Sequence, residues 1–185
     1  MSSVTRDNKA GFEIRALETV QHTVGALPGA LPIARGMSHF GEHALGWIAI
    51  GAGGAALDAP RRREWAGVAV GAVGAHAASI VVKRISRRRR PQHPSVSVGV
   101  STPSQFSFPS SHATSSTAAA VLIGKIVGAP VAAFVVPPML TSRLVLGVHY
   151  PSDVLTGAAL GAASAAAILR RQSYISQTLI PAGEA

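Results

Sequence analysis

The sequence predicts an all-α, polytopic membrane protein with about five transmembrane helices and an N-terminal interfacial helix. Hydrophobic residues make up 48% of the 185 residues and charged residues only 14%, below the roughly 25% that is usual for soluble domains. The basic residues are clustered at 61–63, 83–90 and 170–171, each time at the end of an apolar run. This distribution of charge is typical of helical membrane proteins.

The positive charge does not by itself identify a partner. A formal net charge of +9 would suit a nucleic-acid-binding protein, but such a protein does not need long uncharged stretches between its basic patches. We therefore expect no nucleic-acid partner. The absence of cysteine excludes disulfide bonds and metal sites built from thiolates.

The chain divides into an N-terminal amphipathic segment, a transmembrane domain and a tail. Hydrophobic residues within 1–36 recur at helical spacing, as in a helix that lies on a membrane surface. The expected spans are residues 37–57, 65–82, 110–127, 131–148 and 153–169. The second span is uncharged for 18 residues, about the length that crosses a ~30 Å hydrocarbon core. The domain would extend from 37 to 171, with a flexible tail over 172–185, in a multi-pass plasma (inner) membrane protein.

Three polar motifs lie at the ends of these spans. Residues 83–91 follow the second span, residues 109–112 begin the third, and residues 142–153 join the fourth to the fifth. If all five spans cross the membrane, the three motifs emerge on the same face. Together they supply fixed cations, two histidines, small hydroxyls and one carboxylate, which can bind a phosphate and transfer it to a histidine.

The first motif contains a run of arginines. Four consecutive arginines at a membrane edge are typical of a solvated face that binds lipid headgroups. We expect that role for Arg84 and for residues 87–89. Lys83 and Arg90, which are separated by six residues, are the better candidates for binding a phosphate once the other motifs are considered.

The second motif predicts the start of a helix. Ser110 precedes an apolar helical run and is a natural N-cap. Because the N–H groups at a helix N-terminus bind anions, His112, in the first turn, would face a bound phosphate. The same residues also fit a simple cap with a nearby histidine.

The third motif contains an isolated acid. Asp153 is the only acidic residue between Trp65 and Gly183, so we expect it to have a specific cationic or hydrogen-bonding partner. It follows His149 by four residues, and a carboxylate that accepts a hydrogen bond from one imidazole nitrogen leaves the other nitrogen free to attack. Arg143, six residues before His149, is near enough to share its ligand.

The joint pattern Lys-x6-Arg-Pro, Pro-Ser-x-His and Ser-Arg-x5-His-x3-Asp, from Lys83 to Asp153, resembles the type-2 phosphatidic acid phosphatase superfamily. That superfamily also includes vanadium haloperoxidases and bacterial acid phosphatases. The resemblance implies that His149 attacks phosphorus, that Asp153 orients it, and that His112 is the acid and base. It implies that phosphate is bound by Lys83, Arg90, Ser110, Ser111 and Arg143. Because these cations are fixed in the chain, we expect no metal or cofactor.

One residue departs from the pattern of this superfamily. Ser111 occupies a position that is usually glycine. A role that needs a positive φ is therefore in doubt there, whereas the backbone N–H donor is kept.

Two further segments, 34–43 and 61–65, are similar to actinobacterial members of the superfamily. Those members are assigned as decaprenylphosphoryl-5-phosphoribose phosphatases of arabinan precursor synthesis. The similarity implies a phosphomonoester hydrolase that acts on a polyprenyl-linked phosphosugar in cell wall (arabinogalactan) biosynthesis. His39, Glu42 and His43 are then possible substrate contacts. A phosphatidate or prenyl-diphosphate phosphatase is the alternative within the same chemistry.

Two functions of other classes also fit parts of the sequence. Residues 39–43 match H-x-x-E-H, an inverted zinc-protease signature, and both histidines would share a helix face. A third, carboxylate ligand is hard to find downstream. A non-enzymatic protein that binds anionic lipid through its basic edges would depend more on residues 87–89 than on His149. We expect structural roles for His22, His76 and His93, with His76 hydrogen-bonded between helices.

The distribution of charge also bears on orientation. The expected active face carries Arg6, Lys9, Arg15, Arg35, residues 83–90 and Arg143. The opposite face carries residues 61–63, Lys125, Arg170 and Arg171. The positive-inside rule therefore favours a cytoplasmic active site. The margin is narrow, because several of the counted cations belong to the predicted site.

Overall fold

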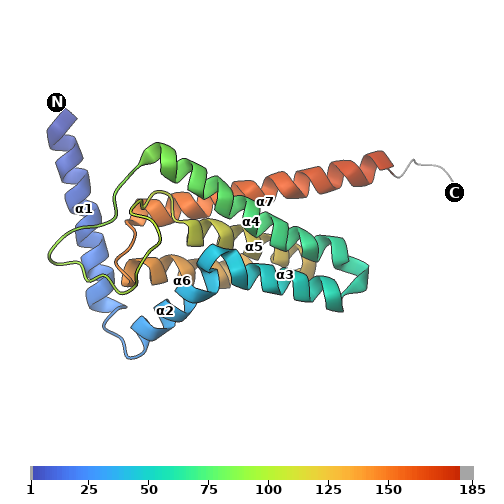
Figure 1. The fold of residues 1–185 in the computed structure, drawn as a ribbon, viewed down its shortest axis with the longest axis horizontal. Coiled ribbons are helices and arrows are strands. Elements are labelled where there is room, and N and C mark those ends of the chain that lie inside the picture. The colour runs from blue at the N-terminus through green and yellow to red at the C-terminus, as the bar shows by residue number, and fades with distance from the viewer. Residues whose placement is uncertain (1, 180–185) are drawn as a thin grey trace.

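The computed structural model describes residues 2–179, and this part of the chain is helical (Figure 1). The α-helices are α1 (Ser2–Thr23), α2 (Ala30–Gly41), α3 (Leu45–Leu57), α4 (Arg62–Ser86), α5 (Ser111–Val127), α6 (Val131–Val145) and α7 (Pro151–Leu179). Two 3-10 turns, η1 (Glu42–Ala44) and η2 (Ala59–Arg61), flank α3. Within residues 2–179 there is no strand, only an isolated bridge between Arg89 and Phe106. The predicted all-α class is confirmed.

Helix α5 is the centre of the bundle. It packs against α4, α6 and α7, and apart from His112 the side chains of its first three turns are the small ones of Ser, Thr and Ala. A Cβ added at Gly161 of α7 would overlap the carbonyl oxygen of Thr114. The backbones of α5 and α7 therefore touch directly, as small residues allow between membrane helices. This contact brings the start of α5 next to the start of α7.

An apolar cluster joins α3, α4, α5 and α7. Trp47, Val68 and Leu122 are buried in it, and the indole N–H of Trp47 donates to Ser116 Oγ at 3.0 Å. Asp58 closes the turn between α3 and α4, because its carboxylate accepts hydrogen bonds from Arg61 and Trp65. Helices α3 and α4 are thus joined by a fixed turn at the end of the bundle away from the 87–110 loop (Figure 1).

Two helical segments among the described residues are long and apolar enough to cross a membrane, Ala59–Ser86 and Pro151–Tyr174. Helix α6 is a shorter apolar helix. The expected first span, 37–57, is wrong as a single helix, because His43 and Ala44 have φ values of 49° and 61° and break it. The 13 residues of α3 are about 20 Å long. The number of five crossings stays a prediction.

The expected segment boundaries also fall inside helices. Residue 36 lies within α2, which continues to Gly41. The tail expected from residue 172 is helical as far as Leu179, and residues 180–185 lie outside the described part of the chain.

Helix α1 lies across the end of the bundle where the 87–110 loop also lies (Figure 1). It packs on α6 and α7, and Leu17 is fully buried. The side-chain amide of Gln21 donates to the carbonyl oxygens of Ser97, at 2.7 Å, and Val145, at 3.0 Å. The N-terminal helix is therefore fastened to the loop and to the end of α6.

Candidate active site

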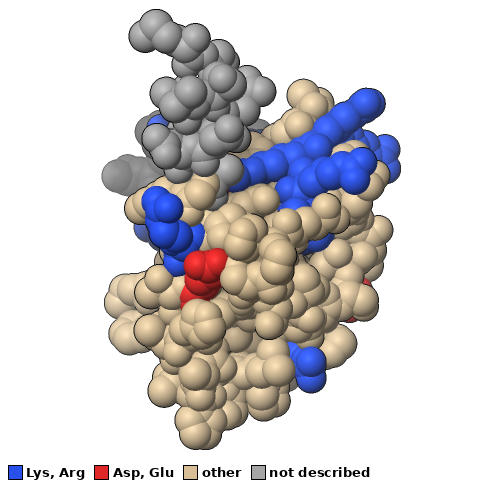
Figure 2. Space-filling view, turned by 90° about the vertical axis from the view of Figure 1, so that its left-hand side faces the viewer, with Lys and Arg blue, Asp and Glu red and all other residues tan. Residues whose placement is uncertain are grey.

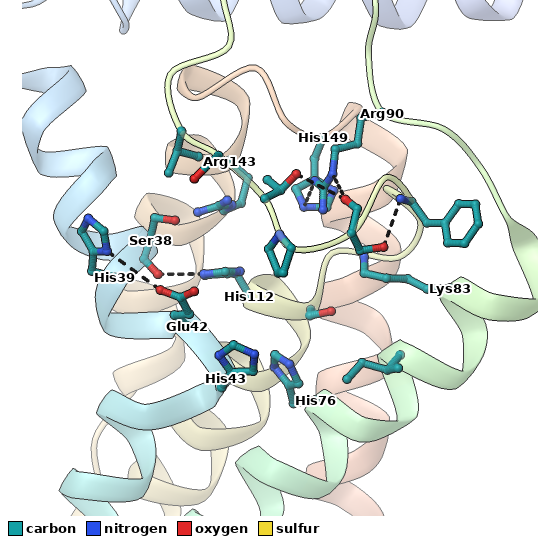
Figure 3. A pocket seen from close by; sticks show the side chains of 18 of the residues that line it. Ser38, His39, Glu42, His43, His76, Lys83, Arg90, His112, Arg143 and His149 are labelled. Carbon is teal, nitrogen blue, oxygen red and sulfur yellow. Dashed lines mark hydrogen bonds and ion pairs between the residues drawn. The ribbon is translucent and has the colours of Figure 1, made fainter.

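The three sequence motifs meet at one cavity of about 440 Å³. Its walls include most of the predicted site residues, namely Lys83, Arg90, Ser111, His112, Arg143 and His149, together with His39, Glu42 and His43. Ser110 and Asp153 lie behind this lining and are fully buried. Figure 3 shows His112 between a group of basic side chains with His149 above it and a second group of histidines below it.

The end of the molecule that carries the loop and α1 is basic. Figure 2 views this end and shows Lys and Arg side chains gathered on one part of it, while acidic side chains are visible only in small areas. Arg87 and Arg89 are exposed at the start of the 87–110 loop, and Arg84 is exposed at the wall of the cavity. An anionic headgroup would be attracted to such a surface.

Lys83 is placed by the last turn of α4 and is 7% exposed. Its Nζ donates to the carbonyl oxygen of Ser107 at 3.0 Å and to that of Pro109. Two of the three ammonium hydrogens thus hold the segment that leads into α5. The third remains to bind an anion in the cavity.

Arg90 lies in the loop after α4 and bridges two segments. Its Nε donates to Ser104 O at 2.8 Å, and its Nη1 donates to Val148 O at 2.7 Å. Burial lowers the pKa of Arg90 to about 10, so the side chain remains cationic at neutral pH. The same Nη1 lies 3.3 Å from Nε2 of His149.

Arg143 is the least satisfied polar group of the site. It lies in the last turn of α6 and is 1% exposed. Its Nε and Nη1 atoms are buried without a hydrogen-bond partner. Because an unpaired buried cation is costly, its retention indicates an anionic ligand in the cavity that it lines.

The second motif forms the predicted cap. Ser110 is the N-cap of α5, and its side chain accepts a hydrogen bond from the N–H of Ala113. The amides of Ser111 and His112 have no carbonyl within the helix to bond. The hydroxyl of Ser111 pairs with that of Ser79 at 2.7 Å. The start of α5 therefore offers backbone donors to an anion.

His149 is 2% exposed, and its two nitrogens face different partners. Nε2 lies next to the guanidinium of Arg90, and Nδ1 lies 3.6 Å from Oδ2 of Asp153. The tautomer that fits both neighbours carries its proton on Nδ1. Burial, and then the charges of Arg90, Arg143 and Lys83, hold the pKa of His149 well below its ordinary value. The ring is therefore neutral, with a lone pair on Nε2 facing the cations.

Asp153 has the specific partners that its isolation predicts. Oδ1 accepts from Arg88 Nη1 at 2.9 Å, and Oδ2 accepts from the N–H of Tyr150 at 2.8 Å. The expectation that Arg88 belongs to a solvated, headgroup-binding face is wrong. Its guanidinium turns inward to a buried carboxylate, because that contact offsets the cost of burying the acid.

His112 is held by a backbone contact that no sequence motif predicts. Its Nε2 lies 2.9 Å from the carbonyl oxygen of Ser38 in α2. A carbonyl only accepts, so Nε2 carries the proton and Nδ1 is the nitrogen that exchanges one. Gly41 packs against the ring, and a Cβ there would lie 2.6 Å from Cδ2 of His112.

A polar patch of His39, Glu42, His43 and His76 also lines the cavity, with His43 and His76 below His112 and His39 to its left (Figure 3). His39 and His43 do not share a helix face, since α2 ends at Gly41 and His43 has a left-handed backbone. The premise of the zinc-protease alternative is therefore wrong. Among the described residues no group of three histidines or acids is arranged to hold a metal ion.

The structural role expected for His76 needs correction. His76 lines the cavity, its ring centroid lies 6.0 Å from that of His43, and its buried Nδ1 has no hydrogen-bond partner. The sequence does carry a pattern that predicts this position. His76 precedes Lys83 by seven residues, which places the two side chains on the same face of α4.

Comparison with known proteins finds a family and several relatives for this chain. The model of the PAP2 superfamily matches residues 65–177. A decaprenylphosphoryl-5-phosphoribose phosphatase from Mycolicibacterium smegmatis is 55% identical over 145 residues, which are 78% of this chain and 81% of the relative. One from Mycobacterium tuberculosis is 53% identical over 150 residues, which are 81% of this chain and 85% of the relative.

A solved structure has the same fold. The first transmembrane PAP2-type phosphatidylglycerolphosphate phosphatase from Bacillus subtilis superposes with a TM-score of 0.70. The match covers 87% of this chain and 86% of that one, at 22% sequence identity. The family model matches more than half of the chain, and the protein therefore belongs to the PAP2 superfamily.

Proposed function

We propose that the protein hydrolyses decaprenylphosphoryl-5-phosphoribose to decaprenylphosphoryl-ribose and inorganic phosphate, at the plasma membrane, for arabinan precursor (cell wall) synthesis. Relatives of that name at 53–55% identity support the substrate. The observation that carries the phosphatase chemistry is the buried, unpaired guanidinium of Arg143 in the cavity that also contains Lys83, Arg90 and His149. The enzyme is a phosphoric monoester hydrolase.

Binding would place the phosphate between three cations. Lys83, Arg90 and Arg143 contact its nonbridging oxygens, with the amides of Ser111 and His112 at the start of α5. Ser110 supports these amides as the N-cap. Such preorganised donors stabilise the charge on the transferring phosphoryl group, a task that a divalent ion performs in other phosphatases.

The first chemical step forms a phosphohistidine. The Nε2 lone pair of His149 attacks phosphorus and the bond from phosphorus to the ribose oxygen breaks. Beside the bound phosphate dianion, His112 carries a proton on both nitrogens, and it gives the Nδ1 proton to the leaving oxygen while Nε2–H stays bonded to the carbonyl of Ser38. Asp153 keeps the proton of His149 on Nδ1 and stabilises the positive charge that develops on the ring.

The second step releases phosphate. Water attacks the phosphorus of the phosphohistidine, and the bond from nitrogen to phosphorus breaks. Having lost its proton in the first step, His112 takes one from the water and returns to its starting state. Both steps therefore use one acid and base without a cofactor.

The polar patch beside His112 would contact the sugar. His39, Glu42 and His43 line the cavity beside the proposed phosphate site, where ribose hydroxyls would lie. The substrate carries a second, lipid-linked phosphate, and none of residues 87–89 lines the cavity that would hold it. Arg84 does line it and is exposed, so we assign the second phosphate to Arg84.

The test is phosphate release by the purified protein from a panel of lipid phosphates. We expect the highest kcat/KM for decaprenylphosphoryl-5-phosphoribose, unchanged in excess EDTA. Glu42→Gln should raise KM for that lipid and leave a small phosphomonoester unaffected, since only the lipid carries the ribose. A much higher kcat/KM for phosphatidate or a prenyl diphosphate would refute the substrate, and complete loss in EDTA with rescue by zinc would refute the metal-free mechanism.

A further inference from the structure

Glu13 of α1 reaches the residues around the proposed nucleophile. One carboxylate oxygen, Oε1, accepts from the N–H of Ser152 at 3.2 Å and from its hydroxyl. The other, Oε2, pairs with Arg88 Nη2. Glu13 lies outside residues 65–177, which the family model matches. The contacts thus come from a part of the chain to which the motifs assign no role.

Arg88 connects Glu13 to the proposed catalytic pair. Its Nη1 donates to Asp153 Oδ1 at 2.9 Å and to Ser152 Oγ at 2.6 Å. Its guanidinium also lies 4.0 Å from the ring centroid of Tyr150, a favourable cation–π distance. One side chain therefore contacts three of the residues that follow His149 directly along the chain.

The local backbone explains why Arg88 differs from its neighbours. Helix α4 ends at Ser86, and Arg87 follows with a left-handed φ of 49°. This turn directs Arg88 inward while Arg87 and Arg89 stay exposed. Position 88 is therefore specified by the helix end and by its partners.

The pair is ionised. Burial acts to raise the pKa of Glu13, but the hydrogen bonds from Ser152 and Arg88 and the charge of Arg88 together lower it. Its side chain is 13% exposed and that of Arg88 is 31% exposed, so solvent screens this pair less than a surface ion pair.

We propose that Glu13 and Arg88 are positioning residues, through which helix α1 holds Asp153 and the 150–153 turn in register with His149. Arg88 donates a hydrogen bond to one oxygen of Asp153 and the Tyr150 amide donates to the other. The carboxylate therefore keeps its position beside His149 only while Arg88 and Tyr150 keep theirs. The inference rests on the proposed roles of His149 and Asp153.

The test is a double-mutant cycle in kcat. Glu13→Gln keeps the shape of the side chain and Arg88→Lys keeps its charge, so both variants should fold. We expect each to lower kcat about tenfold or more, a size typical of misplaced catalytic groups, with KM changed by less than about twofold. In an Asp153→Asn background, Glu13→Gln should cost little more, because residues that act as a unit are not additive.

Glu18→Gln is the matched control. Glu18 lies on the same helix and pairs with Ser95 and His93 of the loop, so it also docks α1, but it touches no residue around His149. We expect normal kcat from it. Wild-type kcat in Glu13→Gln, or a full additional loss in the Asp153→Asn background, would show that α1 has only a structural role.

A second experiment separates a failure of this inference from a failure of the proposed mechanism. A phosphohistidine is trapped by quenching wild type during turnover. Its absence would overturn the assignment of His149 as nucleophile. The coupling between Glu13 and Asp153 in kcat would still decide whether Glu13 acts through Asp153.

Discussion

Nδ1 of His149 lies 3.6 Å from Oδ2 of Asp153, and that oxygen already accepts a hydrogen bond from the amide of Tyr150. The separation is longer than a hydrogen bond, as is common for catalytic contacts before substrate is bound. When Nε2 bonds to phosphorus, the ring becomes positively charged and its attraction to Asp153 increases. The pair is therefore arranged to favour the phosphorylated state of His149.

Removing either member of this pair should separate fold from rate. His149→Ala should abolish turnover, because no other imidazole lies at the position of the nucleophile. Asp153→Asn should keep the fold but lose most of the rate, as a neutral amide no longer holds the tautomer. Phosphate release and circular dichroism measure the two effects. Near-normal activity in His149→Ala would end the phosphohistidine mechanism.

The depressed pKa of His149 predicts an acid-tolerant enzyme. The attacking form is the neutral ring, which persists at every pH above its pKa. Burial and the charge of Arg90 hold that pKa well below the ordinary value, which is about 6.5. As pH falls, the acid loss of kcat/KM should therefore have its midpoint below about pH 6.5. A pH profile measured on wild type checks this, and a midpoint at or above that value would contradict it.

Much of the proposed site could be predicted because consecutive helices alternate in direction. The alternation of the spans predicts that Lys83, His112 and His149 lie at the same end of the bundle. The error in the first span does not affect this prediction, because it depends only on helices α4 to α7. The shared cavity of these residues agrees with the count. The sequence pattern was sufficient because each motif lies at the end of its helix.

The contacts made by α1 and α2 could not be predicted in the same way. Glu13 and Arg88 are 75 positions apart, and no local pattern distinguishes Arg88 from the arginines on either side. The carbonyl of Ser38 and the missing side chain of Gly41 act on His112 through backbone and space alone. Such contacts depend on how helices dock, which propensity and periodicity do not encode.

The orientation of the site in the membrane can be tested at the loop. The positive-inside rule predicts a cytoplasmic active site. Ser97 is exposed in the 87–110 loop, and the contacts of Gln21 with it are to its backbone, so Ser97→Cys should fold normally. We expect an impermeant thiol reagent to leave this cysteine unlabelled in intact cells and to label it after lysis. Strong labelling of intact cells would place the site outside.

Glycine at position 41 should be needed for activity. Its φ of −84° suits any residue, so the only obstacle to Gly41→Ala is the contact of 2.6 Å with His112. The ring must move and lose Ser38, and we expect kcat to fall about tenfold or more. Gly36→Ala on the same helix is the control, because a Cβ there meets nothing within 4 Å. Equal activity of the two variants would show that the position of His112 is not critical.

Arg143 should lower the stability of the ligand-free protein and raise the rate of phosphate hydrolysis. Its buried Nε and Nη1 lack partners, so replacing it with the similarly long but uncharged Met should raise the Tm of the ligand-free protein. The same Arg143→Met change should lower kcat by about 10²-fold or more, as expected for the loss of a donor to the transferring group. Inorganic phosphate should raise the Tm of wild type and not that of the variant, since a ligand stabilises only a state that binds it. Thermal unfolding with and without phosphate measures both effects. A lower Tm in Arg143→Met would show that the guanidinium stabilises the fold. Equal stabilisation of both proteins by phosphate would show that Arg143 does not bind the anion.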